Sequence, residues 1–159
     1  MNKTIDILGN EISFDCMGCD IADHKLIPPG GYIYEDDLIT IAQDPEIPIV
    51  GFMILGTKKH IKSINDLSNE ERHRIMDVLN LTIENMKKIG LCKEVLIIQE
   101  ESSSHFHIWI LPVFPWMDKY DKSVRDIQEI ISYAKDNYNE SVKKELLETI
   151  DKLKTEFRK

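Results

Sequence analysis

A run of alternating side chains near the middle of the chain, "HFHIWIL", constrains the fold more than any other segment. Successive side chains of a β-strand point to opposite faces of its sheet. On a strand, one face would carry the apolar members of the run: Phe106, Ile108 and Ile110. The other face would carry His105, His107 and Trp109. The apolar face must be buried, so the polar face is either a second buried face or the floor of a functional site.

The segments around this run predict an α+β fold with an antiparallel sheet and one long helix. Two hairpins are expected, one turning at Gly9-Asn10 and one at Asp36-Asp37 within "YIYEDDLITIA". The apolar runs "IVGFMILG" and "EVLIIQ" predict two further strands. A capping box formed by Ser68 and Glu71 predicts the start of the long helix, which Gly90 can end.

Two amphipathic helices are expected beyond Pro115, separated by "DNYN" at 136–139. The apolar positions that mark them are Val124, Ile127, Ile131 and Ala134 in the first, and Val142, Leu146, Ile150, Leu153 and Phe157 in the second. At 159 residues the chain has the size of one domain. We therefore expect a main unit over 1–118 and a C-terminal helical extension over 119–159 that packs on it.

The charge balance argues against some classes of partner. The net charge of −8 opposes binding to a nucleic-acid polymer or an anionic membrane, because both need a basic face. The N-terminus has no signal-peptide core, and no later run has transmembrane length. We expect a cytoplasmic protein, in which three cysteines do not form a disulfide framework.

Cys16 and Cys19 form a C-x-x-C pair, which in a reducing compartment indicates half of a zinc site or a redox pair. Zinc needs two more ligands, for which His60 and His105 are available and His24 is in reserve. A chance pair of buried cysteines is the remaining interpretation.

Two histidines on one strand are often structural, held by hydrogen bonds alone. Directly before them stand three serines, Ser102, Ser103 and Ser104, whose hydroxyls and free amides could hold a phosphate. These serines favour a functional site over a purely structural role for the two histidines. Other candidates are weaker: His73 is expected to be exposed on its helix, and Trp116 and Tyr120 are either packing residues or a lid.

The sequence resembles the histidine triad family of nucleotidyl hydrolases and transferases, in particular its zinc-bearing bacterial members similar to diadenosine polyphosphate hydrolases. The family signature, H-x-H-x-H-x-x commonly followed by proline, is matched at His105, His107 and Pro112, with Trp109 at the third histidine position. "CMGCDI", "YEDD" and "GFMILGTKKHI" resemble, in order, the family's opening helix, its first hairpin, and the strand that ends in a basic pair and a histidine. The resemblance runs from about Cys16 to Pro112.

The resemblance implies a role for each matching position. His107 would attack the α-phosphorus of a nucleotide and form a nucleotidyl-histidine that water then hydrolyses. Ser102 would contact phosphate, and Asp44 would bind the ribose. The structural Zn²⁺ ligands would be Cys16, Cys19, His60 and His105, and a closed site of this kind braces the protein without activating water.

The leading hypothesis is an enzyme that cleaves a nucleoside polyphosphate, such as diadenosine tetraphosphate, or a nucleotide phosphoramidate. His107, His105 and Trp109 would form its catalytic group. The alternative is a zinc-braced nucleotide-binding protein with little or no turnover, because Trp109 cannot relay a proton. A metalloenzyme with an open coordination position is a third interpretation. The resemblance also implies a homodimer, although the C-terminal helices could instead cap a monomer.

Overall fold

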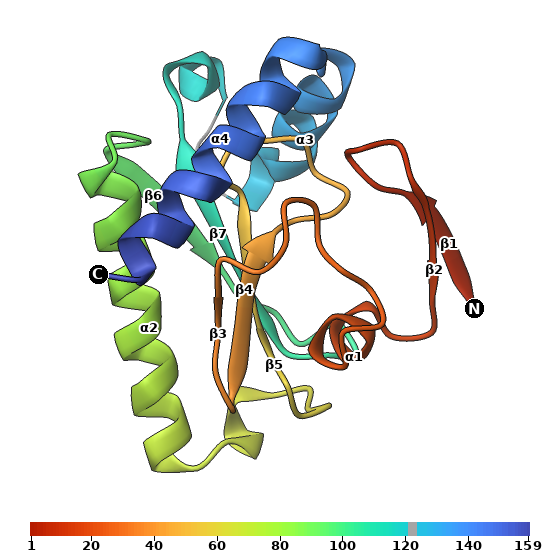
Figure 1. The fold of residues 1–159 in the computed structure, drawn as a ribbon, viewed down its shortest axis with the longest axis vertical. Helices are drawn as coiled ribbons and strands as arrows, with labels where there is room; N and C mark the ends of the chain where they lie inside the picture. Colours follow the sequence, from red (N-terminus) through yellow and green to blue (C-terminus); the bar gives the residue numbers. More distant parts are fainter. Residues whose placement is uncertain (121–123) are drawn as a thin grey trace.

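The computed structural model describes residues 1–120 and 124–159, which form an α+β structure around one antiparallel sheet (Figure 1). Neighbouring strands in the sheet follow the order β3-β4-β5-β7-β6. These strands are β3 (Tyr34–Glu35), β4 (Ile39–Gln43), β5 (Met53–Thr57), β7 (His107–Val113) and β6 (Glu94–Ile98). A separate two-stranded ribbon, β1 (Asn2–Ile5) and β2 (Glu11–Phe14), stands to one side of the sheet (Figure 1). The predicted fold class is confirmed.

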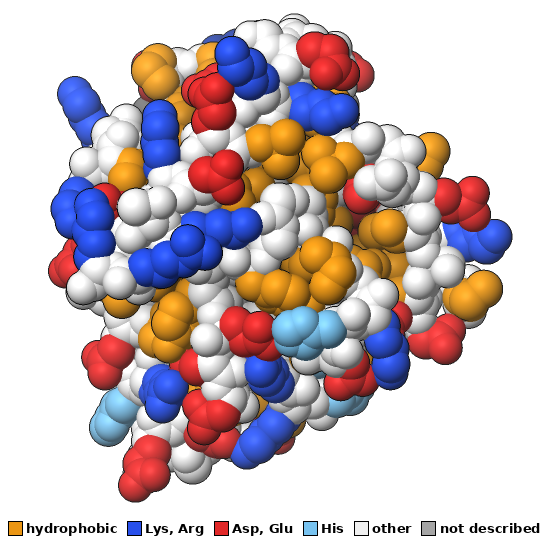
Figure 2. Space-filling view, viewed as in Figure 1, with side chains coloured by type: hydrophobic (Ala, Val, Ile, Leu, Met, Phe, Trp, Pro, Cys, Tyr) orange, Lys and Arg blue, Asp and Glu red, His pale blue; other side chains and the backbone are white. Residues whose placement is uncertain are grey.

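In residues 1–120 and 124–159, four α-helices and three short 3-10 turns accompany the strands. The helices are α1 (Met17–Ala22), α2 (Asn69–Lys88), α3 (Ile127–Asp136) and α4 (Glu140–Phe157), and the turns are η1 (Ile64–Asp66), η2 (Pro115–Lys119) and η3 (Val124–Asp126). In the described part of the chain, no helix combines the length and the apolar character needed to cross a membrane. Lysines, arginines and acidic side chains are intermixed over the face seen in Figure 2.

The alternation along β7 divides the protein interior into two clusters. Ile108 and Ile110 pack in a cluster that includes side chains of α2 and α4. Leu111 packs in a second cluster with side chains of α3, and Trp109 lies against it. Burying an isoleucine or leucine side chain of this kind contributes about 1.5–3 kcal/mol. Both faces of β7 therefore pack in the protein interior, and only part of its polar face is left for a site.

Helix α2 begins and ends where the sequence predicts. The Ser68 hydroxyl accepts a hydrogen bond from the Glu71 amide (3.1 Å), and the Glu71 carboxylate accepts one from the Ser68 amide (2.8 Å). Gly90 follows the helix with φ +74°, which satisfies the last carbonyls without a side-chain clash. The predicted hairpin turns also form, and the Asp36 carboxylate holds the second by accepting hydrogen bonds from the amides of Leu38 (2.7 Å) and Ile39 (2.9 Å).

Two strands are shorter than their apolar runs. Strand β5 starts only at Met53, because a turn precedes it in which Gly51 has φ +70° and the Phe52 amide donates to the Ile49 carbonyl (3.0 Å). Strand β7 starts at His107, because the Phe106 amide donates to the Ile61 carbonyl and not to a neighbouring strand. His105 therefore lies on the approach to β7.

The C-terminal helices form on either side of the predicted break. Asn139 caps α4 through its side-chain oxygen, which accepts hydrogen bonds from the amides of Ser141 (2.9 Å) and Val142 (3.1 Å). Leu146 and Leu153 of α4 are fully buried in the cluster that includes α2. Residues 121–123 of the proposed 119–159 extension lie outside the described residues.

Candidate active site and metal centre

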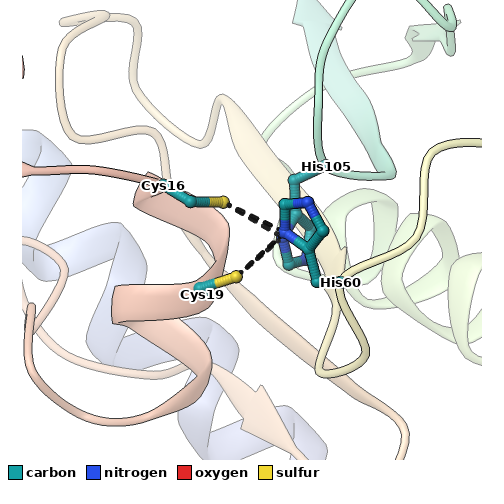
Figure 3. Close-up of side chains that lie close together, drawn as sticks. All are labelled: Cys16, Cys19, His60 and His105. Carbon is teal, nitrogen blue, oxygen red and sulfur yellow. Dashed lines mark hydrogen bonds between the residues drawn. The ribbon is translucent and has the colours of Figure 1, made fainter.

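Four side chains from three distant parts of the sequence meet at one point (Figure 3). Cys16 caps the N-terminus of α1, and Cys19 lies in its first turn. His60 follows β5, and His105 precedes β7. One ligand atom from each of the four lies within 4.8 Å of all the others. These are the four residues that the sequence predicts as a zinc site.

The distances within this cluster match tetrahedral zinc coordination. The Cys16 sulfur lies 3.5 Å from His60 Nδ1 and 3.3 Å from His105 Nδ1, and the Cys19 sulfur lies 3.0 Å and 3.5 Å from the same two atoms. Zn–S bonds of about 2.3 Å and Zn–N bonds of about 2.0–2.1 Å at tetrahedral angles require sulfur and nitrogen to be about 3.5 Å apart. The donor set therefore fits a structural Zn²⁺ site of the Cys₂His₂ type.

His105 is oriented by a hydrogen bond on the side of its ring that faces away from the sulfurs. Its Nε2 lies 2.7 Å from the Thr57 carbonyl, which can only accept, so Nε2 carries the proton. In the neutral ring Nδ1 then has a free lone pair directed at the two cysteines. Burial lowers the pKa of His105, which favours this neutral form. Both ring nitrogens of His105 therefore have partners, Nε2 in the Thr57 carbonyl and Nδ1 in the cysteine cluster, and neither is left for proton transfer.

Gly18 allows the cluster to close. A Cβ added at this position would lie 2.6–2.8 Å from atoms of the His105 ring, well inside contact distance. Any other residue at position 18 would push the imidazole away from the two cysteines.

The Cys19 thiol holds its proton when no metal is bound. Burial, followed by a hydrogen bond from Cys16, raises the pKa of the Cys19 thiol to about 11. A thiol with so high a pKa is a poor nucleophile and a poor redox partner at neutral pH, whereas a metal ion displaces its proton on binding. The redox interpretation of the C-x-x-C pair is therefore disfavoured.

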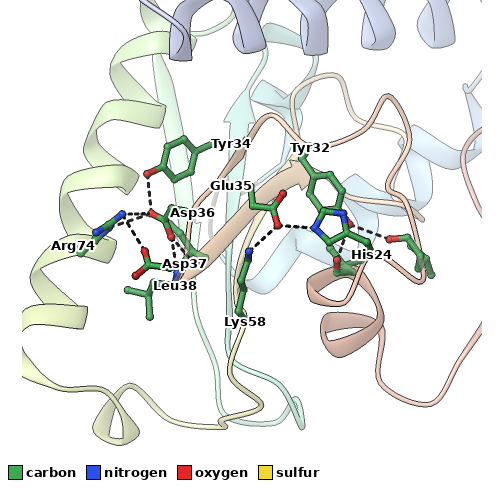
Figure 4. A network of polar contacts seen from close by, with 12 residues as sticks. His24, Tyr32, Tyr34, Glu35, Asp36, Asp37, Leu38, Lys58 and Arg74 are labelled. Atoms are coloured by element: carbon green, nitrogen blue, oxygen red, sulfur yellow. Dashed lines mark hydrogen bonds and ion pairs between the residues drawn. The ribbon is translucent and has the colours of Figure 1, made fainter.

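His24, the reserve ligand, lies in a different polar network (Figure 4). Its Nε2 is 2.7 Å from the Glu35 carboxylate, which also pairs with Lys58 Nζ at 2.8 Å. The His24 backbone adopts φ +59°, in the left-handed region, just after α1 ends. His24 thus ties the end of α1 to β3 and takes no part in the metal cluster.

Beside the cluster is a cavity of about 320 Å³ that collects most of the predicted site residues. Its walls include Asp44, Ser103, Ser104, His107 and Trp109. His105 and Cys16 form part of its boundary with the metal cluster. The cavity and the metal site are therefore adjacent parts of one structure.

His107 has one ring nitrogen committed and one without a partner. Its Nδ1 lies 3.0 Å from the His105 carbonyl, which can only accept, so Nδ1 carries the proton. In the neutral ring Nε2 then keeps a free lone pair, and no described residue forms a hydrogen bond with it. This is the arrangement that a nucleophilic histidine requires.

The three serines are not equivalent. Ser103 and Ser104 line the cavity, and the Ser103 hydroxyl bonds to the backbone of His105 through its carbonyl (3.0 Å) and its amide (3.3 Å). Ser102 is exposed, does not line the cavity, and donates to the Glu100 carboxylate (2.6 Å).

Asp44 lies at the other end of the cavity, directly after β4. One of its carboxylate oxygens accepts hydrogen bonds from the amides of Glu46 (2.8 Å) and Ile47 (2.9 Å). Burial raises its pKa to about 7, and those two amides oppose the rise. A carboxylate held at a cavity wall in this way can accept hydrogen bonds from ligand hydroxyls.

Trp109 fills the position next to His107 on the same face of β7. The two ring centroids are 6.0 Å apart, and the indole packs edge-on against the buried Phe52 ring at 5.4 Å. The indole is half-buried, and one side of it lines the cavity. The other large aromatic candidate, Trp116, stacks on Tyr133 of α3 at 5.0 Å, as a packing residue would.

Several residues that form the cavity carried no recognisable signal in the sequence. Asn2 and Phe14, which pair across the β1–β2 ribbon, contribute to its wall. Gly56 pairs with His107 across β5 and β7, and a Cβ there would meet only the Thr40 hydroxyl, at 3.9 Å. The missing side chain leaves open space beside His107, and a glycine at the end of a predicted strand was the one available hint.

No protein-family model matches the sequence, and no curated protein matches it either. Solved structures do share its fold. A HIT-like protein involved in cell-cycle regulation from Bartonella henselae superposes with a TM-score of 0.64 at 14% identity, over 91% of this chain and 98% of that chain. A hypothetical histidine triad nucleotide-binding protein from Sulfolobus tokodaii gives 0.58 at 17% identity, over 87% and 94%.

A Zn-bound histidine triad family protein from Mycobacterium smegmatis gives a TM-score of 0.58 at 16% identity, over 89% of this chain and 96% of that chain. At these identities the likeness establishes the fold. The chain has the histidine triad fold that its motifs led us to expect, over most of its length and not only between the opening C-x-x-C pair and Pro112.

Proposed function

We propose that this protein is a nucleotidyl hydrolase or transferase that acts through a covalent intermediate on His107. The observation that carries the proposal is the free Nε2 of His107 at the wall of a cavity that also holds Ser103 and Ser104. The solved structures that share the fold include one described as nucleotide-binding, which supports a nucleotide as the ligand.

The proposed reaction has two steps. The Nε2 lone pair attacks the α-phosphorus, so that a P–N bond forms and the bond to the leaving group breaks, with the electron pair departing on that group. Water then attacks the phosphorus of the nucleotidyl-histidine, the P–N bond breaks with its electron pair returning to Nε2, and the proton that the water loses passes to solvent as the nucleotide leaves. The His105 carbonyl holds Nδ1–H throughout and stabilises the charge that develops on the ring.

The remaining residues bind and orient the nucleotide. Ser104 offers its hydroxyl and both serines offer their backbone amides to the phosphate, beside the open space at Gly56, while the Ser103 hydroxyl holds the His105 backbone in place. Asp44 accepts hydrogen bonds from the ribose at the far end of the cavity. Cys16, Cys19, His60 and His105 would hold a structural Zn²⁺, which would fix His105 and α1 in place without taking part in the reaction.

The substrate class is a nucleoside polyphosphate, of which diadenosine tetraphosphate is the test compound, or a nucleotide phosphoramidate. The direct test mixes the protein with diadenosine tetraphosphate, stops the reaction within a short time by a quench that uses no acid, and measures the intact mass of the protein. A covalent nucleotidyl adduct that maps to the peptide containing His107 is the expected result. Absence of an adduct together with absence of product release would contradict the proposal.

A second candidate is a zinc-braced nucleotide-binding protein with little turnover. Trp109 favours it, because an indole at the third histidine position supplies no proton. Tight nucleotide binding by calorimetry without any product would select this candidate.

A further inference from the structure

We propose that Trp109 limits the reaction to leaving groups that depart as weakly basic oxygen anions and excludes amines. This inference rests on the proposed nucleotidyl transfer at His107. It selects anhydrides of a nucleotide, such as polyphosphates and acyl phosphates, over phosphoramidates.

The position of the indole puts it beside the reacting phosphorus. Trp109 follows His107 by two residues on the same face of β7, and their ring centroids are 6.0 Å apart. Both side chains line the cavity. The indole N–H has no hydrogen-bond partner among the described residues, and it is not buried. It is therefore free to donate a hydrogen bond to a ligand oxygen.

An indole N–H is a donor that does not release its proton. It can stabilise charge that develops on an oxygen of the phosphate or of the leaving group, as a neutral hydrogen-bond donor does. It cannot transfer a proton to that group. The same position occupied by an imidazole could do both.

Among the described residues that line the cavity, none is placed to supply the missing proton beside Trp109. His105 and Cys16 are committed to the metal cluster. From Trp109, which pairs with Ile54 and through it with Ala42, Asp44 lies two residues further along the chain and two strands across, so the backbones are about 7 Å and about 10 Å apart in the two directions. From His107, which pairs with Gly56 and through it with Thr40, Asp44 lies four residues further along. Four residues along a strand and two strands across place the two backbones about 13 Å apart in one direction and about 10 Å in the other.

The other two carboxylates in the cavity wall are also unsuited to this role. Glu46 accepts a hydrogen bond from the Thr4 hydroxyl of the ribbon (2.8 Å) and lies beyond Asp44 along the chain. The Asp15 side chain is 88% exposed to solvent and pairs with the N-terminal ammonium group at 3.3 Å, so it is directed away from the interior of the cavity. Serine hydroxyls at positions 103 and 104 are too weakly acidic to act as general acids.

The chemistry of the first step then depends on the leaving group alone. A phosphate or carboxylate leaves with the electron pair as a stable anion, since these groups have pKa values of about 4–6. An amine would have to leave as an amide anion unless it receives a proton as the P–N bond breaks. Without a proton donor beside His107, the amine stays bound and the adduct does not form.

The test compares three AMP derivatives: the p-nitrophenyl ester, the less reactive phenyl ester, and the anilide, which is joined through nitrogen. Release of the leaving group in the first turnover is followed by rapid quench. We expect the wild-type protein to release p-nitrophenolate rapidly and phenolate more slowly. Release of aniline should be slower than release of phenolate by roughly 10²–10⁴-fold, the range that general acid catalysis supplies.

Two variants separate proton transfer from shape. W109H should raise aniline release by about 10²-fold relative to p-nitrophenolate release, because it restores a proton donor. W109F, which keeps a flat ring but has no N–H, should leave the preference against the amine unchanged and slow all three substrates. W116H is the matched control, because Trp116 stacks on Tyr133 and does not line this cavity.

Equal release of aniline and phenolate by the wild-type protein would overturn the inference while leaving the proposed function intact. A W109H variant that accelerates the ester and the anilide equally would overturn it as well. No release from any of the three compounds would overturn the proposed function and this inference with it. The wild-type series decides the matter even if W109H does not fold.

Discussion

His105 lies just before β7 and His107 is the first residue of that strand, yet the structure uses the two histidines in opposite ways. Both ring nitrogens of His105 have partners, with Nε2 on the Thr57 carbonyl and Nδ1 facing the two cysteines. Among the described residues, His107 has a hydrogen-bond partner on Nδ1 only. His105 is also fully buried, whereas His107 is half-exposed at the cavity wall.

This difference shows that the environment of each ring decides its role. A ring nitrogen that has a fixed partner holds the structure together, and a ring nitrogen without one is available for chemistry. The roles of the metal cluster and of the cavity can therefore be separated by mutation, although His105 and His107 are only two residues apart in the chain. The following predictions separate them experimentally.

The largest expected effect is that of His107→Ala on turnover. Loss of the covalent step should lower kcat on diadenosine tetraphosphate by several orders of magnitude, beyond the roughly 10²–10⁴-fold of general acid–base catalysis alone. The free energy of unfolding should change by about 1 kcal/mol or less, because the side chain is half-exposed. Equal turnover by the variant and the wild type would remove His107 from the chemistry.

Cys16→Ser should have the largest effect on stability. Metal binding is coupled to folding, so loss of one ligand should lower the free energy of unfolding by several kcal/mol and reduce the zinc content from about one ion per chain. Cys92→Ser is the matched control, because Cys92 is partly buried and lies outside the cluster. Chemical denaturation and metal analysis of both variants check this, and equal zinc content in the two would contradict it.

Asp44→Asn should change the pH dependence of stability. The Asp44 pKa is raised from 3.8 to about 7, so the folded protein holds this proton more tightly than the unfolded chain. The resulting stabilisation is complete below about pH 4 and is lost as the pH rises through about 7. Asparagine keeps an oxygen for the amides of Glu46 and Ile47 and never ionises.

The Asp44→Asn variant should therefore be more stable than the wild type at pH 8, by on the order of a few kcal/mol, with the gap narrowing as the pH falls to 5. Nucleotide affinity should fall about tenfold, because a charged acceptor for the ribose is lost. Urea denaturation across pH 5–8 measures the first effect, and parallel stability curves for the two proteins would refute it.

The smallest effect is expected from His24→Gly. The variant loses a surface ion pair with Glu35, worth about 0–1 kcal/mol, and gains about as much from relief of the left-handed backbone conformation. Zinc content should not change. His60→Gly, which removes a histidine of the cluster, should lose the metal, and a loss of zinc from His24→Gly would show that His24 is a ligand after all.

The sequence predicted those features that depend on local spacing. The Ser68–Glu71 capping box, the alternation after His105 and the C-x-x-C pair each carry their information within a few residues. The set of four metal donors was also found, because zinc accepts few ligand types and His60 and His105 were available.

Features that depend on the path of the chain in space could not be predicted. His24 follows a short helix and itself adopts a left-handed backbone conformation, which directs its side chain to Glu35. Ser102 is turned outward by Glu100, although it is adjacent to two serines that face the cavity. Phe14 reaches the cavity only because its ribbon folds beside the sheet. None of these positions has a periodic pattern that fixes its surroundings.

The central claim is that His105 braces the protein and His107 carries the chemistry. Native mass spectrometry after brief incubation with diadenosine tetraphosphate reads bound zinc and covalent nucleotide in one spectrum, for the wild type, His105→Ala and His107→Ala. We predict zinc and adduct on the wild type, zinc without adduct on His107→Ala, and no zinc on His105→Ala. An adduct on His107→Ala, or full zinc content in His105→Ala, would contradict this division of roles.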